Sequence, residues 1–270
     1  EVETGNQYYT SKDASGTNNC HAIISKQEVN GVAANTLISG CQNTIIPNNV
    51  TNLGYKAFEG CTAMTALLLP RSVTSLGDSC FKGCTALRHV VLSASIEHIG
   101  RYAFCDCESL EELTLPESIT ALHRCTFFNC RSLKSITIPE SVRTLGRYIF
   151  ARCSALQKVE LPNSIVYVDI GAFSDCYSLS FVHMPDAIRV VSDYTFSCCG
   201  NLETVELPEH INYIGNAAFC HCKQLKELTL SQDVKRIGHS AFMGCISLEE
   251  ITIPAEEYGQ CATGNGMTQV

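Results

Sequence analysis

A phenylalanine recurs every 23 residues through most of the chain, nine times and without an insertion. A cysteine follows each one by three residues, and aliphatic residues stand eight and five positions before it and nine and eleven after it. The phenylalanines are Phe58, Phe81, Phe104, Phe127, Phe150, Phe173, Phe196, Phe219 and Phe242. A 23-residue unit is too short to bury its own apolar face. So strict a repeat therefore predicts a solenoid, in which stacked units share one continuous core.

Each unit contains the pattern LxxLxLP, which alternates apolar and polar residues and predicts a short strand with one buried face. Stacked strands of this kind form a parallel β-sheet, and the proline ends each strand. A second short extended segment follows, as in SITAL at 118–122. A glycine then permits a tight bend before a short helical turn that carries the phenylalanine. With rungs about 4.8 Å apart, nine units would be roughly 40–45 Å long.

The combined pattern IPxSVxxIGxxAFxxCxSLxxIxI resembles the BspA-like leucine-rich repeat family. LPESITALHRCTFFNCRSLKSITIPESV at 115–142 shows it well, although His123 replaces the usual glycine. The resemblance spans residues 46–254. It implies a right-handed, curved leucine-rich-repeat β-solenoid with the parallel sheet on its concave face. It also implies an exported or cell-surface bacterial protein used for adhesion or partner binding, and it supplies no catalytic residues.

Both ends of the chain depart from the repeat, so we expect three parts. These are an N-terminal cap with a β-hairpin at 1–46, the solenoid of nine 23-residue repeats at 47–254, and a C-terminal tail at 255–270. CHAIISK (20–26) and NTLISGC (35–41) predict the hairpin strands, which would cover the apolar edge of the first rung. Cys20 and Cys41 flank this hairpin and could form a disulfide.

The chain has 17 cysteines, an odd number that cannot all pair. The nine cysteines of the repeat are expected to pack inward as small apolar side chains that point in parallel rather than towards each other. Cys198 and Cys220, on adjacent units, could form a disulfide. With His221 they make only three metal ligands outside the column, so we predict no metal site. Cys105 is expected to be a half-exposed bystander on its turn.

The composition argues against several functional classes. The net charge is −8 and both signs are spread along the chain, which argues against a nucleic-acid surface. No stretch reaches the roughly 18 apolar residues of a membrane span. The sequence contains no HExxH, GxSxG or phosphate-loop pattern. We predict neither an enzyme nor a cofactor, although a Cys–His nucleophile that is assembled only in space stays open.

The expected binding face consists of the outward side chains of the parallel sheet, eight and ten residues after each phenylalanine. Phe181 is an aromatic residue in a column that should face water, and His183 lies on the same face. Aromatic anchors with a polar rim are typical of binding hot spots. The predicted ligand-binding residues are Lys158, Glu160, Phe181, His183, Thr204 and Glu206.

Three other surfaces stay open as alternatives. An apolar patch of Ala66, Leu68 and Val91 near the N-terminal end could bind a partner or simply contact the cap. A column of Tyr102, Tyr148 and Tyr194 could stack on glycans or shield the turns. The last units are acidic and could meet a basic partner or simply be solvated: Glu203, Glu206, Glu227, Glu249, Glu250, Glu256 and Glu257.

We therefore expect a monomeric, non-catalytic module that binds a protein or glycan, and, by the family resemblance, an extracellular or cell-surface location. The alternatives are a structural spacer without a specific ligand and an intracellular interaction scaffold, with which the cysteine content is compatible. The chain opens at Glu1 rather than Met, as a trimmed mature form would, so its lack of a signal peptide says little about export.

Overall fold

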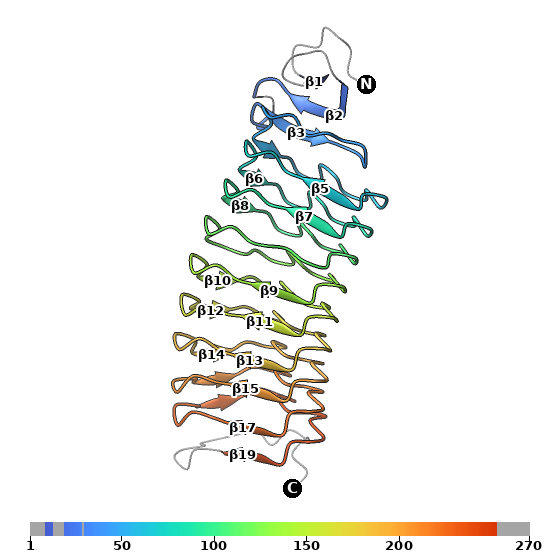
Figure 1. Ribbon diagram of the computed structural model, residues 1–270. Coiled ribbons are helices and arrows are strands. Elements are labelled where there is room, and N and C mark those ends of the chain that lie inside the picture. Colours follow the sequence, from blue (N-terminus) through green and yellow to red (C-terminus); the bar gives the residue numbers. More distant parts are fainter. Residues whose placement is uncertain (1–8, 13–18, 29, 253–270) are drawn as a thin grey trace.

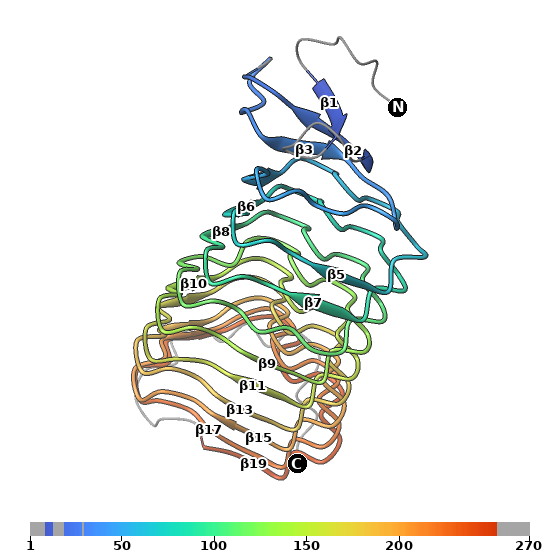
Figure 2. The same ribbon diagram turned by 45° about the horizontal axis from the view of Figure 1, so that its top comes forward.

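The computed structural model describes residues 9–12, 19–28 and 30–252, which wind into a stack of similar rungs (Figure 1). Most rungs contribute one short strand to each of two rows of strands, which run along different sides of the stack (Figure 2). Among the described residues, hydrogen bonding divides these rows into seven sheets of two to six strands. We call the strands that come just before the proline the principal sheet, and those that come after it the second sheet. The predicted parallel β-solenoid is thereby confirmed.

The strands are short and their register follows the repeat. The principal sheet has β5 (Ala66–Leu68), β7 (His89–Val91), β9 (Ser135–Thr137), β11 (Lys158–Glu160), β13 (Phe181–His183), β15 (Thr204–Glu206), β17 (Glu227–Thr229) and β19 (Glu250–Thr252). The second sheet has β4 (Asn52–Leu53), β6 (Ser75–Leu76), β8 (His98–Ile99), β10 (Thr144–Leu145), β12 (Tyr167–Val168), β14 (Val190–Val191), β16 (Tyr213–Ile214) and β18 (Arg236–Ile237). Paired strands are parallel, and residues 23 apart face each other, as Ser135 and Lys158 do.

One rung keeps the burial pattern of the repeat but forms no strand. Around Leu113 there are only isolated bridges, between His89 and Glu112 and between Leu122 and Leu145. Leu113 is nevertheless buried while its neighbour Glu112 is exposed. Burial of the alternating side chains, rather than a continuous hydrogen-bond ladder, therefore carries the repeat through this rung.

The segment that carries each phenylalanine is a series of turns, so the prediction of a short helical turn was wrong. No helix occurs in the described residues. In the unit of Phe104, Tyr102 and Asp106 have φ of 57° and 59°, and equivalent residues have positive φ in the other rungs. A left-handed residue interrupts a right-handed helix. The N–H groups of Tyr102 and Phe104 donate instead to Arg124 and Thr126 of the next rung, at 3.1 and 2.9 Å.

The repeated glycine is required because neighbouring rungs approach closely there. A Cβ on Gly146 would lie 2.6 Å from the backbone nitrogen of Arg124 and from the carbonyl carbon of His123. Glycine fills the same position in five other rungs, while His123, Asp169 and Ser192 fill it in the rest. The column thus avoids contact with the backbone of the preceding rung, and none of its glycines needs a positive φ.

The core is organised around a stack of phenylalanine rings. Neighbouring rings from Phe58 to Phe242 lie 5.3–5.7 Å apart between centroids and are tilted by no more than 19°. The rings from Phe58 to Phe219 are completely buried, and Phe242 is partly buried. Each ring therefore depends on the rungs above and below it, as the short repeat unit requires.

The cysteines of the repeat form a second internal column. From Cys84 to Cys245, each Sγ donates to the carbonyl oxygen of the phenylalanine in the preceding rung, at 3.0–3.2 Å. Those from Cys84 to Cys222 are buried. The predicted inward packing of this column is confirmed, and the structure adds a weak hydrogen bond between rungs to its role.

The N-terminal segment extends the second sheet. β2 (Asn19–Ser25) lies antiparallel to β1 (Tyr9–Lys12) and to β3 (Thr36–Ser39), and β3 pairs in parallel with β4. Both predicted hairpin strands are therefore present. The predicted tail at 255–270 lies outside the described residues. No helix in the described part of the chain is long and apolar enough to cross a membrane.

Candidate functional site

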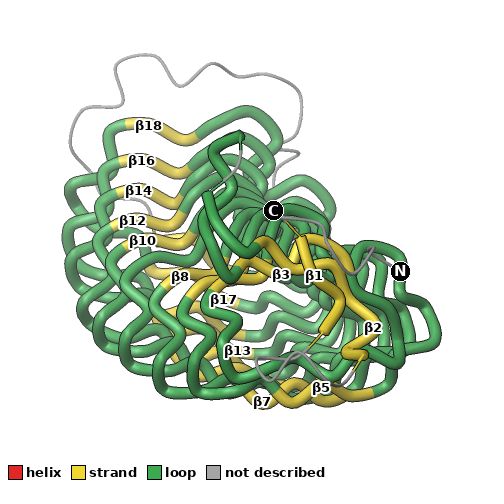
Figure 3. The backbone as a smooth tube through the Cα atoms, turned by 90° about the horizontal axis from the view of Figure 1, so that it is seen from above, coloured by secondary structure: helices red, strands yellow, loops and turns green. Residues whose placement is uncertain are grey.

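The outward face of the principal sheet has the alternation that the sequence predicted. In β9, β11, β13, β15 and β17 the central residue is buried and the two residues beside it are exposed. Seen along the stack, these strands lie away from the second-sheet strands β10–β18 (Figure 3). The exposed first and third residues of these strands therefore form two columns on one continuous surface, and the residue types differ from rung to rung.

The predicted site residues occupy three successive rungs of this surface. Phe181 on β13 is 42% exposed and lies opposite Thr204 on β15. His183 lies opposite Glu206, and its Nδ1 is 2.8 Å from the Glu206 carboxylate. These four residues thus form one patch, with an exposed aromatic ring beside a polar pair. A partner can cover this ring while removing few polar groups from water.

The rung before this patch carries a second exposed pair. The ammonium group of Lys158 lies 2.6 Å from the carboxylate of Glu160 on the same strand, β11. Both side chains are more than half exposed. Exposed ion pairs contribute little to stability, so these charges are available to a partner. The six predicted residues therefore lie on neighbouring rungs of one face.

A second apolar surface lies nearer the N-terminus and was only partly foreseen. Ile45, Leu68 and Val91 occupy one outward column on adjacent rungs and are 74%, 73% and 60% exposed. We call them the aliphatic ridge; it borders a shallow hollow of about 640 Å³ that Arg71 also lines. The structure does not support the alternative that Leu68 and Val91 contact the cap, because both are largely exposed and the hairpin continues the second sheet. Ile45 was missed because it precedes the first complete repeat.

The predicted disulfides have different outcomes. Cys198 and Cys220 are both free thiols, so the structure does not contain the disulfide suggested for them. Their backbones are joined by a hydrogen bond from Cys198 N–H to the Cys220 carbonyl, 2.7 Å long. They occupy different positions of adjacent rungs, two residues after Phe196 and one residue after Phe219. The suggested Cys20–Cys41 pair stays a prediction, because the Cys20 side chain lies outside the described residues.

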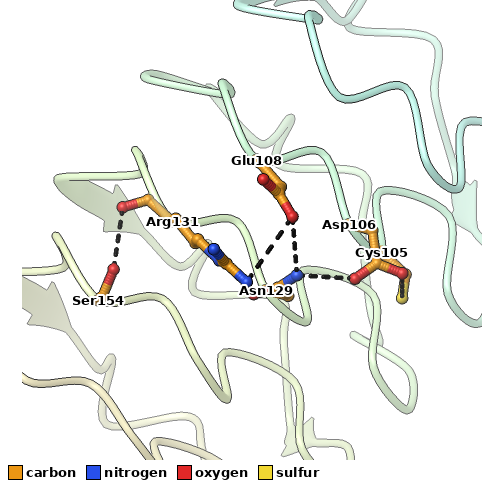
Figure 4. Close-up of polar contacts among 6 residues, drawn as sticks. All are labelled: Cys105, Asp106, Glu108, Asn129, Arg131 and Ser154. Carbon is orange, nitrogen blue, oxygen red and sulfur yellow. Dashed lines mark hydrogen bonds and ion pairs between the residues drawn. The ribbon is translucent and has the colours of Figure 1, made fainter. Parts of the chain in front are cut away.

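Cys105 is buried at 4% exposure, so the prediction that it is half-exposed was wrong. Figure 4 shows the polar contacts around it. The Cys105 thiol lies 3.3 Å from the Asp106 carboxylate, which accepts a 2.8 Å hydrogen bond from the Asn129 amide. The Arg131 guanidinium donates to Asn129 and lies 3.8 Å from Glu108. This network joins adjacent rungs at their turns.

The buried thiols of Cys84 and Cys105 are poorly suited to nucleophilic chemistry. Burial raises the pKa of Cys84 to about 12. Burial, followed by the hydrogen bond to Asp106, also raises the pKa of Cys105. Only a thiolate is strongly nucleophilic, and these groups stay protonated near neutral pH. Within the described ranges, no three His, Cys, Asp or Glu side chains gather as metal ligands would.

The tyrosine column lies on the turns beyond the second sheet. Tyr102, Tyr148 and Tyr194 all have positive φ. The guanidinium of Arg124 lies 5.7 Å from the Tyr102 ring centroid, and that of Arg147 lies 5.3 Å from the Tyr148 centroid. Two of the three rings are therefore already engaged by arginines. Of the predicted acidic end, Glu203, Glu206, Glu227, Glu249 and Glu250 are exposed.

Comparison with known proteins identifies the repeat. The sequence model described as BspA type Leucine rich repeat region matches residues 38–157 and 144–261. A leucine-rich repeat protein from Bacteroides ovatus ATCC 8483 is 25% identical, with a TM-score of 0.71 over 93% of this chain and 70% of that one. No curated protein sequence matches significantly.

Two further solved structures are similar over much of their length. The T. pallidum Leucine Rich Repeat protein is 24% identical, with a TM-score of 0.48 over 92% of this chain and 91% of that one. A leucine rich cell surface protein from Faecalibacterium prausnitzii A2-165 is 22% identical, with a TM-score of 0.45 over 76% of this chain and 77% of that one.

Proposed function

Because the chain belongs to the BspA-type leucine-rich repeat family, we propose that it is a non-catalytic module that binds a macromolecular partner, a protein or a glycan, on the outward face of the principal sheet. The observation that carries this proposal is the exposure of apolar side chains at two places on that face. They are Phe181 and the aliphatic ridge. Exposed apolar patches with a polar rim are characteristic of interaction sites.

The two patches can serve one extended partner because they lie on the same face. Phe181 offers a single aromatic anchor with charged neighbours on β11 and β15. The ridge offers three adjoining aliphatic side chains and a hollow beside them. Three rungs lie between them, with the outward residues Glu112 and Thr114, Ser135 and Thr137, and Lys158 and Glu160. A partner that touched both patches would thus also meet charged side chains on this face.

The binding test is a screen of the purified protein against extracellular-matrix proteins and a glycan array. Phe181→Ala/His183→Ala and Leu68→Ser/Val91→Ser are compared with wild type, and Ser135→Ala/Thr137→Ala on an intervening rung is the matched control. We expect a ligand whose affinity falls at least about tenfold in one of the first two variants, as for a hot-spot residue. A ligand unaffected by all three variants would move the site elsewhere, and no ligand at all would favour a structural spacer.

We further propose an extracellular or cell-surface location, which rests on the family resemblance. The second candidate is an intracellular interaction scaffold, which the free thiols at Cys198 and Cys220 favour, since reduced cysteines are normal in the cytosol. Antibody labelling of intact and of permeabilised source cells separates the two. Labelling that requires permeabilisation would overturn the surface location and leave the binding proposal untouched.

A further inference from the structure

A column of side chains at the far edge of the second sheet changes character in the middle of the stack. It consists of the residue three positions before each phenylalanine. Its members, in order, are Tyr55, Asp78, Arg101, Arg124, Arg147, Ile170, Asp193, Asn216 and His239. Three adjacent rungs therefore place an exposed arginine at the same position. We call Arg101, Arg124 and Arg147 the arginine ladder.

At Asp78, Asp193 and Asn216 of this column, a side-chain oxygen accepts a hydrogen bond from a backbone N–H group of the next rung. Asp78 accepts a hydrogen bond from Arg101 N–H at 2.7 Å, and Asp193 accepts one from Asn216 N–H at 2.7 Å. Asn216 does the same for the next rung, at 2.8 Å. The side chain of an Asp or Asn at this position is thus long enough to reach the backbone of the following rung.

The arginine ladder lacks these internal acceptors. Arg101 and Arg124 occupy the positions that would serve the N–H groups of Arg124 and Arg147, and a guanidinium group has no acceptor atom. In the part of the chain that the structure describes, neither of these two N–H groups has an acceptor. Two backbone donors without an acceptor therefore lie beside the exposed arginine side chains.

The three guanidinium groups also lack acidic partners. Among the described residues none of them forms an ion pair, whereas Arg88 pairs with Glu111 and Arg131 with Glu108. Arg124 and Arg147 lie over tyrosine rings instead, and the Arg124 guanidinium also interacts with the Cys125 and Tyr102 side chains. Uncompensated like charges on adjacent rungs destabilise the fold, and such a cost is typical of functional sites.

Two histidines lie beside this surface. The rings of His98 and His123 lie 5.3 Å apart between centroids, next to the first rungs of the ladder. His98, Arg101 and Asp78 all act electrostatically on His123, and Asp78 is the one acid among these three. The carboxylate of Asp78 already accepts the backbone hydrogen bond of Arg101. The surface is thus built to receive negative charge from outside the chain.

We propose that the arginine ladder is a binding site for a sulfated polysaccharide. The three cations occupy the same position of adjacent rungs, which are about 4.8 Å apart, and this fits a polymer that carries anionic groups at regular intervals. A sulfate ester offers several acceptor oxygens, enough to meet a planar guanidinium and a backbone N–H together. A nucleic acid would need a longer basic track than three arginines.

The direct test is binding of fluorescent heparin to the purified protein, with desulfated heparin, polyglutamate and single-stranded DNA as comparison polymers. Arg101→Gln/Arg124→Gln/Arg147→Gln removes the ladder, and Arg88→Gln/Arg131→Gln/Arg189→Gln removes the same charge elsewhere. We expect at least about a tenfold loss of heparin affinity in the ladder variant only, a lower salt dependence, and little binding of the comparison polymers. Equal loss in both variants, or equal binding of DNA or polyglutamate, would overturn the proposal.

A second variant separates binding from folding. Arg101→Asp supplies the missing acceptor to Arg124 N–H, as Asp78 does one rung earlier. We expect this variant to bind heparin at least about tenfold more weakly while its Tm rises by about 1–4 °C. Unchanged heparin affinity would refute the site. Phe181→Ala/His183→Ala is expected to keep full heparin affinity, because the arginine ladder does not lie on the principal sheet. The heparin proposal therefore does not depend on the function proposed for that sheet.

Discussion

His123 shows how a single residue can depart from the repeat. It stands where six rungs have glycine, and its ring packs beside that of His98. Partial burial lowers the pKa of His123, and the positive charges of His98 and Arg101 lower it further, while Asp78 opposes them. The neutral imidazole is therefore the form that this rung accommodates.

The stability of the protein should fall in mild acid because of this residue. The folded-state pKa of His123 lies below the unfolded value of about 6.5, so its contribution is present above that pH and is lost as the pH falls through the folded-state pKa. His123→Gly removes the titrating group. We expect a smaller difference in free energy of unfolding between pH 7.5 and pH 5.0 in this variant than in wild type, measured by urea denaturation. His98→Gln, which removes one positive neighbour, should give an intermediate difference; equal differences in all three proteins would contradict this assignment.

The glycine column makes a second prediction at the residue scale. A Cβ at position 146 would meet backbone atoms of the preceding rung at 2.6 Å, and backbone cannot move aside without opening the stack. We expect Gly146→Ala to lower the free energy of unfolding by about 1–3 kcal/mol. Gly200→Ala is the matched control, because no heavy atom lies within 4 Å of its added Cβ. A similar cost for both substitutions would mean that close approach is not the reason for the glycine.

The phenylalanine stack is the main element that joins one rung to the next. Each ring has an aromatic neighbour on both sides except at the two ends. Phe150→Ala would leave a cavity between two complete rungs, and we expect a loss of about 3–5 kcal/mol in the free energy of unfolding. Phe242→Ala should cost less, since that ring is partly exposed and stacks on one side only. The chain has no tryptophan, so urea denaturation followed by far-UV circular dichroism is the suitable measurement; equal costs would show that stacking adds little to burial.

Whether an element could be predicted from the sequence depends on how far apart along the chain the residues that determine it lie. The alternation around Ile136 or Val182 is local, and the buried and exposed positions of these strands follow from it. The turns around Phe104 were mispredicted because their positive φ is supported by hydrogen bonds to the next rung, 22 residues away. The arginine ladder was invisible for the same reason: its members are 23 residues apart, so a search for clustered basic residues along the chain finds none.

At the scale of the whole molecule, the turns have a common direction of hydrogen bonding. In the unit of Phe150, the N–H groups of Tyr148, Phe150 and Arg152 all donate to the following rung, at 2.8–2.9 Å. The pattern repeats along the stack, so each rung satisfies donors of the one before it. In the last rung, Ser240, Phe242 and Gly244 have no acceptor for these N–H groups among the described residues. Stability in such an array is a sum of rung and interface contributions, and among the described residues the last rung has one interface fewer.

Hydrogen exchange should therefore reveal a gradient along the stack. We expect the amide of Phe242 to exchange at least about a hundredfold faster than that of Phe150, because the first can exchange by fraying of one rung and the second only by opening several. Amide exchange resolved by NMR measures both, with the Gly200 amide, which bonds within its own turn to the Cys198 carbonyl, as a local reference. Uniform protection from Phe58 to Phe242 would mean that the stack opens as one cooperative unit and that its last rung is covered in solution. A gradient would show that rungs open singly from the end, which leaves the central rungs, with Phe181 and the arginine ladder, as the most rigid binding surface of the molecule.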